Sequence, residues 1–126
     1  MTTGHCNCGG VVFEITAPLA PGSLCHCGQC RRQAGHAWAS ASIPQTALIF
    51  TSDDTLTWFE ASPAARRGFC NRCGSFLFWQ HKEEDTISVS LGVLDPPTET
   101  RIARHIFTAD KGDYYDIDGE LPQRDR

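Results

Sequence analysis

The sequence predicts a single domain of mainly β structure. The chain has 126 residues, the length of one domain with a modest hydrophobic core. Short runs rich in β-branched and aromatic residues are separated by glycine, proline and aspartate turns, the pattern of successive antiparallel strands. Helical periodicity is weak, and its best case is a turn or two over residues 29–33. A core of this size favours an additional source of stability.

The expected strands follow one another closely along the chain. The first, residues 11–16, is a β-branched run that ends at a turn containing proline and glycine. Residues 48–51 and 55–61 flank a Ser52-Asp53-Asp54 turn, and we expect them to pair as a hairpin. From about residue 116 the chain is acidic and irregular, which predicts a loosely ordered tail of the single domain 1–126. The other expected strands are 36–42, 67–70, 76–80, 86–91 and 102–107.

The charge balance argues against several classes of partner. The formal net charge is −4, whereas proteins that bind nucleic acid concentrate lysine and arginine on one face, so we expect no nucleic-acid partner. The one basic cluster is small: Arg31-Arg32, which Arg66-Arg67 could join. No apolar run approaches the length that spans a bilayer, so no membrane partner is expected. The first residues lack the basic and apolar regions of an export signal, which favours a cytoplasmic location. Nothing in the sequence favours a particular oligomeric state.

Seven cysteines are many for a chain of this length. In a reducing compartment such thiols serve as metal ligands, nucleophiles or core residues, and an odd number would leave one thiol outside any set of disulfides. Metal binding is therefore favoured over a disulfide framework. The cysteines fall into three segments: Cys6-x-Cys8, Cys25-His26-Cys27-x-x-Cys30 and Cys70-x-x-Cys73-Gly74.

Two of these segments contribute two thiols each and together complete a tetrahedral zinc site. Cys6 and Cys8 present their sulfurs to the same side if the segment is extended. Cys70-x-x-Cys73 followed by Gly74 is typical of a zinc knuckle, in which glycine permits a tight turn that aims backbone N–H groups at the thiolates. These four cysteines are predicted to form a structural zinc site that closes a long loop.

The other three thiols, Cys25, Cys27 and Cys30, have no fourth cysteine to complete a second tetrahedron. Three protein ligands with one free position are typical of catalytic zinc, so we predict a second, labile and catalytic zinc site on these residues. One alternative is a redox dithiol at Cys27-x-x-Cys30, although that motif normally opens a helix within a βαβ unit, which the sequence pattern does not predict. Another is a site completed by a histidine, although His26 points away if the segment is extended. The histidines available for such a site are His5, His26, His36, His81 and His105.

In these segments the sequence resembles the glutathione-dependent formaldehyde-activating enzyme family, which also includes centromere protein V. The resemblance extends over nearly the whole chain and implies a beta-tent fold of small antiparallel sheets around zinc sites. The segments that carry it are Gly4-x-Cys6-x-Cys8-Gly9, Cys25-His26-Cys27-x-x-Cys30-Arg31 with Gly35, Phe69-Cys70-x-x-Cys73-Gly74, Gly92-x-Leu94-Asp95, His105-Ile106-Phe107 and Tyr114-Tyr115. It implies structural zinc ligands at Cys6, Cys8, Cys70 and Cys73 and catalytic zinc ligands at Cys25, Cys27 and Cys30.

The family reaction indicates what this chain would do. The family reaction joins glutathione to formaldehyde to give S-hydroxymethylglutathione, which is carbon–sulfur lyase chemistry run in reverse. We therefore expect a zinc-dependent enzyme of lyase type that acts on a small thiol, with glutathione as co-substrate, and on formaldehyde or a related aldehyde. Arg31 and Arg32 are candidate substrate-binding residues, because arginine holds carboxylates through charge-assisted hydrogen bonds. The alternative is a non-catalytic zinc-binding or protein-interaction module, in which the three-cysteine site stores zinc or forms a contact surface.

Overall fold

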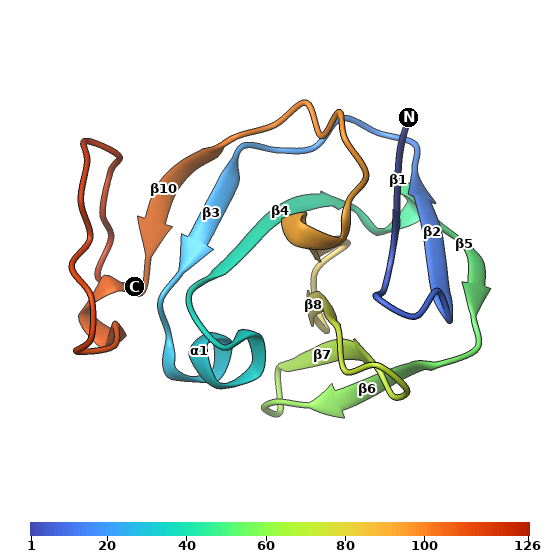
Figure 1. Ribbon diagram of the computed structural model, residues 1–126, viewed down its shortest axis with the longest axis horizontal. Helices are drawn as coiled ribbons and strands as arrows, with labels where there is room; N and C mark the ends of the chain where they lie inside the picture. The colour runs from blue at the N-terminus through green and yellow to red at the C-terminus, as the bar shows by residue number, and fades with distance from the viewer.

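The computed structural model describes residues 1–126 as a single, mainly β domain, which confirms the predicted fold class (Figure 1). Its strands are β1 (Thr2–His5), β2 (Val11–Ile15), β3 (Gly22–Cys25), β4 (Trp38–Pro44), β5 (Leu48–Asp53), β6 (Leu56–Glu60), β7 (Ala65–Cys70), β8 (Phe76–His81), β9 (Thr86–Ser90) and β10 (Ile102–Ile106). The α-helix is α1 (Gly28–Ala34), and the 3-10 turns are η1 (Gln45–Ala47), η2 (Leu91–Val93) and η3 (Thr108–Asp110). None of these helices is long and apolar enough to cross a membrane.

The strands form two sheets that share the main core. β1, β2 and β5 make an antiparallel three-stranded sheet. The other strands form a seven-stranded sheet in the order β10-β3-β4-β9-β8-β7-β6, in which only the β10–β3 pair is parallel. Figure 1 shows this sheet curving from β10 at the left of the molecule to β6 at the bottom. In the main core Phe13 of β2 meets Phe78 of β8 edge to face, with ring centroids 5.3 Å apart.

The predicted hairpin of residues 48–51 and 55–61 is wrong. Both segments are strands, but β5 pairs with β2, and β6 pairs with β7. Side chains along β5 alternate between half-buried and exposed, and Leu48 and Phe50 pack against the main core. The chain therefore passes from one sheet to the other at the predicted turn, because each strand buries its apolar face against a different neighbour.

Two short strands have no clear signal in the sequence. β1 and β3 are four residues long, and neither shows the alternation of apolar and polar residues that marks a half-buried strand. β1 lies against β2, and β3 lies between β10 and β4. Pairing with neighbours thus supplies the stability that local propensity lacks.

Gly4 of β1 occupies a position where no side chain fits. A Cβ atom there would lie 2.7 Å from Phe13 Cζ and 2.9 Å from the carbonyl oxygen of Val93. Because a backbone carbonyl cannot turn aside, we expect Gly4→Ala to lower the free energy of unfolding by about 1–3 kcal/mol, measured by urea denaturation. Gly92→Ala is the control, since no atom lies within 4 Å of its added Cβ. Equal stability of Gly4→Ala and wild type would contradict the packing of β1 on β2.

The C-terminal residues return to the edge of the seven-stranded sheet. The backbone N–H of His105 donates to the carbonyl of Pro122, and the N–H of Arg124 donates to the carbonyl of His105, both at 2.9 Å. Residues 122–124, within the segment for which the sequence predicts a loosely ordered tail, thus lie beside β10 (Figure 1).

Candidate metal centres and the adjoining cavity

The first candidate metal centre joins two turns of the chain. Cys6 and Cys8 lie in the turn between β1 and β2, whereas Cys70 and Cys73 lie where β7 turns into β8. The four sulfurs lie within 4.8 Å of one another, and the Cys6–Cys8 and Cys8–Cys70 separations are both 3.6 Å. Tetrahedral zinc with four thiolates places its sulfurs about 3.8 Å apart, so this donor set fits zinc.

Both halves of this centre are built on a turn that ends in a left-handed glycine. The N–H of Gly9 donates to the carbonyl of Cys6 at 3.1 Å, and Gly9 has a φ of 81°. The N–H of Gly74 likewise donates to the carbonyl of Cys70 at 2.9 Å, with a φ of 80°. Glycine adopts this conformation without strain. The knuckle at Cys70 was expected, but the first cysteine pair converges through a turn and not through the expected extended segment.

Hydrogen-bond donors surround the sulfurs of this centre. The backbone N–H groups of Arg72 and Cys73 each donate to Cys70 Sγ at 3.4 Å. Burial raises the pKa of Cys70, but the Thr55 hydroxyl and these N–H groups outweigh it and bring the pKa to about 7. The hydrogen bond with Ser75 Oγ is the largest of the effects that lower the pKa of Cys73 to about 5. These donors favour the thiolate, which is the form that binds a metal.

The second candidate metal centre lies at the junction of β3 and α1. Cys25 ends β3, Cys27 caps the N-terminus of α1, and Cys30 lies in the first turn of the helix. Their sulfurs lie within 4.8 Å of one another, and the N–H of Cys30 donates to Cys27 Sγ at 3.4 Å. Contacts with the thiols of Cys25 and then Cys30 hold the pKa of Cys27 well below its usual value. A compact group of three sulfurs with one thiolate already favoured fits three zinc ligands.

No histidine belongs to this group of donors. His26 is buried with both ring nitrogens engaged: Nδ1 is 2.6 Å from the Tyr115 hydroxyl, and Nε2 is 3.0 Å from Nδ1 of His105. His36 Nδ1 is 2.6 Å from the hydroxyl of Tyr114. These contacts hold the C-terminal segment against the cysteine loop, so the position of His26 does not favour a site completed by that histidine.

The local structure around Cys27 and Cys30 fits the redox alternative, but the surrounding fold does not. Cys27-x-x-Cys30 does follow a strand and open a helix, an arrangement that the sequence pattern did not predict. However, the next strand, β4, runs antiparallel to β3. The unit is therefore not the parallel βαβ unit in which dithiol oxidoreductases carry this motif.

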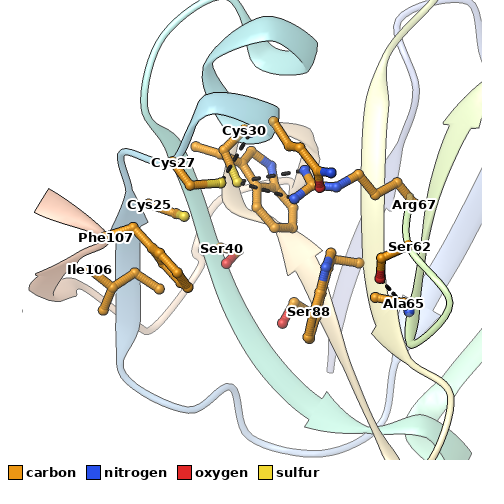
Figure 2. A pocket seen from close by; sticks show the side chains of 13 residues that line it. Cys25, Cys27, Cys30, Ser40, Ser62, Ala65, Arg67, Ser88, Ile106 and Phe107 are labelled. Carbon is orange, nitrogen blue, oxygen red and sulfur yellow. Dashed lines mark hydrogen bonds between the residues drawn. The ribbon is translucent and has the colours of Figure 1, made fainter. Parts of the chain in front are cut away.

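The three-cysteine group opens into a cavity of about 350 Å³ (Figure 2). The register of the seven-stranded sheet explains how the cavity is lined. Arg67 pairs with Trp79 and Trp79 with Ser88, while Cys25 pairs with Ile106. Paired residues of a sheet point to the same face, so side chains from six strands gather around one hollow. Other residues that line it are Trp38, Ser40, Ser62, Ala65 and Phe107.

Arg67 is the arginine of this cavity. Its side chain is buried, and both terminal nitrogens donate to Cys30 Sγ, at 3.5 and 3.6 Å. Its Cζ lies 5.4 Å from the ring centroid of Phe76, and its buried Nε has no partner. A divalent ion held by three thiolates would carry one net negative charge, which this buried guanidinium would offset.

Arg31 and Arg32, the predicted substrate-binding residues, do not line the cavity. Arg31 Nε donates to the carbonyl of Asp110 at 3.3 Å, and Arg32 is exposed on α1. Arg66, the neighbour of Arg67, lies over Trp58 instead, with its Cζ 3.8 Å from the ring centroid. Only one of the four arginines of the predicted basic cluster therefore reaches the cysteine group.

Comparison with known proteins identifies the family of this chain. The family described as glutathione-dependent formaldehyde-activating enzyme matches residues 1–110. The chain belongs to this family. No curated protein sequence matches it. The fold of this family member is similar to the crystal structure of a Rhodobacter sphaeroides protein, with a TM-score of 0.64 and 24% identity over 79% of this chain and 98% of that one. At that identity the likeness shows a shared fold alone.

Sequence reasoning missed the aromatic wall beside the cysteines of this family member. Trp38 is buried, its ring centroid lies 4.3 Å from that of Phe76, and its Nε1 donates to Ser90 Oγ at 2.7 Å. Trp79 lines the same cavity. A signal was available in the expected strand 36–42, where Trp38 falls on the same face as the serines two and four residues later.

Proposed function

We propose that this family member is a zinc-dependent enzyme of carbon–sulfur lyase type that joins a small thiol to formaldehyde or a related aldehyde, with glutathione as the candidate co-substrate. The observation that carries the proposal is the three-thiol group in the wall of a cavity of about 350 Å³. Membership of a formaldehyde-activating family supports thiol and aldehyde as the substrate classes. The four-cysteine group would then be the structural zinc site. All seven cysteines are free thiols, which suits a cytoplasmic location.

Cys25, Cys27 and Cys30 would hold the catalytic ion, and Arg67 would balance its charge. Zinc bound there would supply a free coordination position and would lower the pKa of a thiol that occupies it. The hydrogen bonds from Arg67 to Cys30 draw negative charge away from the ligand set, which counteracts the weakening of a Lewis acid by three thiolates. Trp38 is fixed by its bond to Ser90 and gives the cavity a rigid apolar wall.

The reaction itself requires one new bond. The thiol releases its proton, and its sulfur attacks the carbonyl carbon of the aldehyde. The S–C bond forms as the π pair of the C=O bond moves to oxygen, and the oxygen takes up a proton to become a hydroxyl. Nothing is oxidised or reduced. The chain needs to supply a lowered thiol pKa and a fixed position for the sulfur beside the carbonyl carbon.

A binding measurement tests this proposal. We expect calorimetry with zinc-loaded protein to detect glutathione, and to give S-methylglutathione an affinity at least about tenfold lower, because a methylated sulfur cannot become a thiolate. Cys27→Ser should lose the tighter binding. Formaldehyde exchange followed by NMR should then show S-hydroxymethylglutathione forming faster with wild type than with Cys27→Ser.

Two outcomes would contradict the proposal at different steps. Equal affinity for glutathione and S-methylglutathione would rule out coordination of a thiolate at the three-cysteine site. Selective thiol binding without any acceleration of the exchange would rule out catalysis and leave the alternative, a zinc-binding module.

A further inference from the structure

A second hollow of about 310 Å³ adjoins the cysteine cavity. The two hollows share Ser40, Ser88 and Ile106 in their walls, so they form neighbouring parts of one concave surface. The cysteine cavity is mainly apolar, whereas the second hollow is polar. Its polar side chains are those of Ser23, Ser40, Ser42, Ser88, Arg104 and Arg124.

The register of the sheet sets the distance between this polar hollow and the cysteine sulfurs. Cys25 of β3 pairs with Ile106 of β10, and Ser23 pairs with Arg104. Residues two apart on a strand lie on the same face, so Arg104 points to the side that carries Ile106. Two residues of strand advance about 7 Å. Arg104 therefore sits roughly 7 Å along the sheet from the row that contains Cys25.

The cationic and hydroxyl groups of the polar hollow are free to bind a ligand. Neither Arg104 nor Arg124 has a side-chain hydrogen bond or a salt bridge, although acidic residues outnumber basic ones in the chain, 15 to 11. No acidic residue lines either hollow. The hydroxyl of Ser40 also makes no hydrogen bond within the chain, and the hydroxyls of Ser42 and Ser88 hydrogen-bond only to each other, at 3.4 Å. Two unpaired guanidinium groups beside hydroxyl donors favour an anion.

The guanidinium groups of the other arginines near the cysteines already have partners within the chain. Arg67 donates to Cys30, Arg31 donates to a backbone carbonyl, and Arg66 lies over Trp58. Arg124 is brought beside β10 by the hydrogen bond from its N–H to the His105 carbonyl. Arg124 lies outside residues 1–110, the part of the chain that matches the family.

We propose that the polar hollow binds a carboxylate of the thiol substrate, with Arg104 and Arg124 as the residues that recognise it. The inference rests on the proposed function and names the substrate class: thiols that carry a carboxylate roughly 7–10 Å from the sulfur. Planar guanidinium groups match the two oxygens of a carboxylate, and the serine hydroxyls complete its hydrogen bonds. Neutral thiols of the same length would gain only the contacts of the sulfur and the alkyl chain.

A matched pair of thiols tests this subsite. We expect zinc-loaded wild type to bind ω-mercaptohexanoate about tenfold or more tightly than ω-mercaptohexanol in calorimetry, because the two differ only in the carboxylate. The double variant Arg104→Gln/Arg124→Gln should bind both thiols alike, with the affinity for ω-mercaptohexanol unchanged. Arg101→Gln/Arg126→Gln is the control for the loss of two positive charges, since both residues are exposed and line neither hollow.

The remaining outcomes distinguish a failure of the carboxylate subsite from a failure of the proposed function. Equal affinities for the two thiols in wild type would overturn the carboxylate subsite and leave thiol binding intact. A loss of the preference in Arg101→Gln/Arg126→Gln as large as in Arg104→Gln/Arg124→Gln would do the same. Failure of both thiols to bind wild type would overturn the proposed function and this inference with it.

Discussion

We expect Cys73→Ser to yield unfolded or insoluble protein and Cys27→Ser to remain folded. The four-cysteine group ties turns that are far apart in the sequence, since Cys8 and Cys70 are 62 residues apart. Closing a loop of this length costs conformational entropy, and zinc binding offsets that cost because the complete site exists only in the folded chain. Structural zinc contributes roughly 10–16 kcal/mol of folding free energy, which matches or exceeds the whole stability of a typical domain, about 5–15 kcal/mol.

Cys27→Ser is a suitable partner for this comparison because it also removes one sulfur. Cys27 is the N-cap of α1, and serine is among the best residues at that position, so the helix should keep its first turn. Thermal melting followed by circular dichroism, with zinc counted by native mass spectrometry, measures both effects. We expect Cys27→Ser to melt within a few degrees of wild type and to lose at most one zinc. Similar melting of the two variants with full zinc occupancy would contradict the division into a structural and a catalytic site.

The cysteine pattern predicted which thiols come together better than local patterns predicted the pairing of strands. Spacing within each segment is local information: Cys70, Cys73 and Gly74 define a turn wherever the chain places them. The partner of β5 was not local information, because the Ser52-Asp53-Asp54 turn fits a hairpin as well as a crossing between sheets. The choice is made by burial of Leu48 and Phe50 against the main core.

The walls of the cavity lay beyond sequence reasoning for the same reason. Trp38, Trp79 and Arg67 come from three strands, and only the register of the sheet places them around the cysteines. Arg31 and Arg32 were selected because they follow Cys30 in the sequence. On a helix, however, adjacent residues point in different directions, and burial of Cys30 turns Arg31 and Arg32 away from the cavity.

We expect Arg67→Met to weaken zinc binding at the three-cysteine group by about 10–100-fold, the usual effect of removing a group that supports metal ligands. Methionine keeps much of the length of the side chain but removes both hydrogen bonds to Cys30 Sγ. The net negative charge of a zinc ion with three thiolates would then be buried without a counter-charge. Competition with a chromophoric chelator measures the loss, and the four-cysteine site in the same molecule should keep its affinity.

Arg66→Met is the matched control, because it removes the same charge one residue away. Arg66 donates to Gln80 and lies over Trp58, and it makes no contact with a cysteine. Arg67→Lys should fall between Arg67→Met and wild type, since lysine restores the charge but cannot direct two N–H groups at one sulfur. Equal zinc affinities of Arg67→Met and wild type, or an equal loss in Arg66→Met, would show that the guanidinium does not support the ligand set. A loss confined to Arg67→Met would instead show that the buried guanidinium, despite its unpartnered Nε, is retained for its charge beside the three sulfurs.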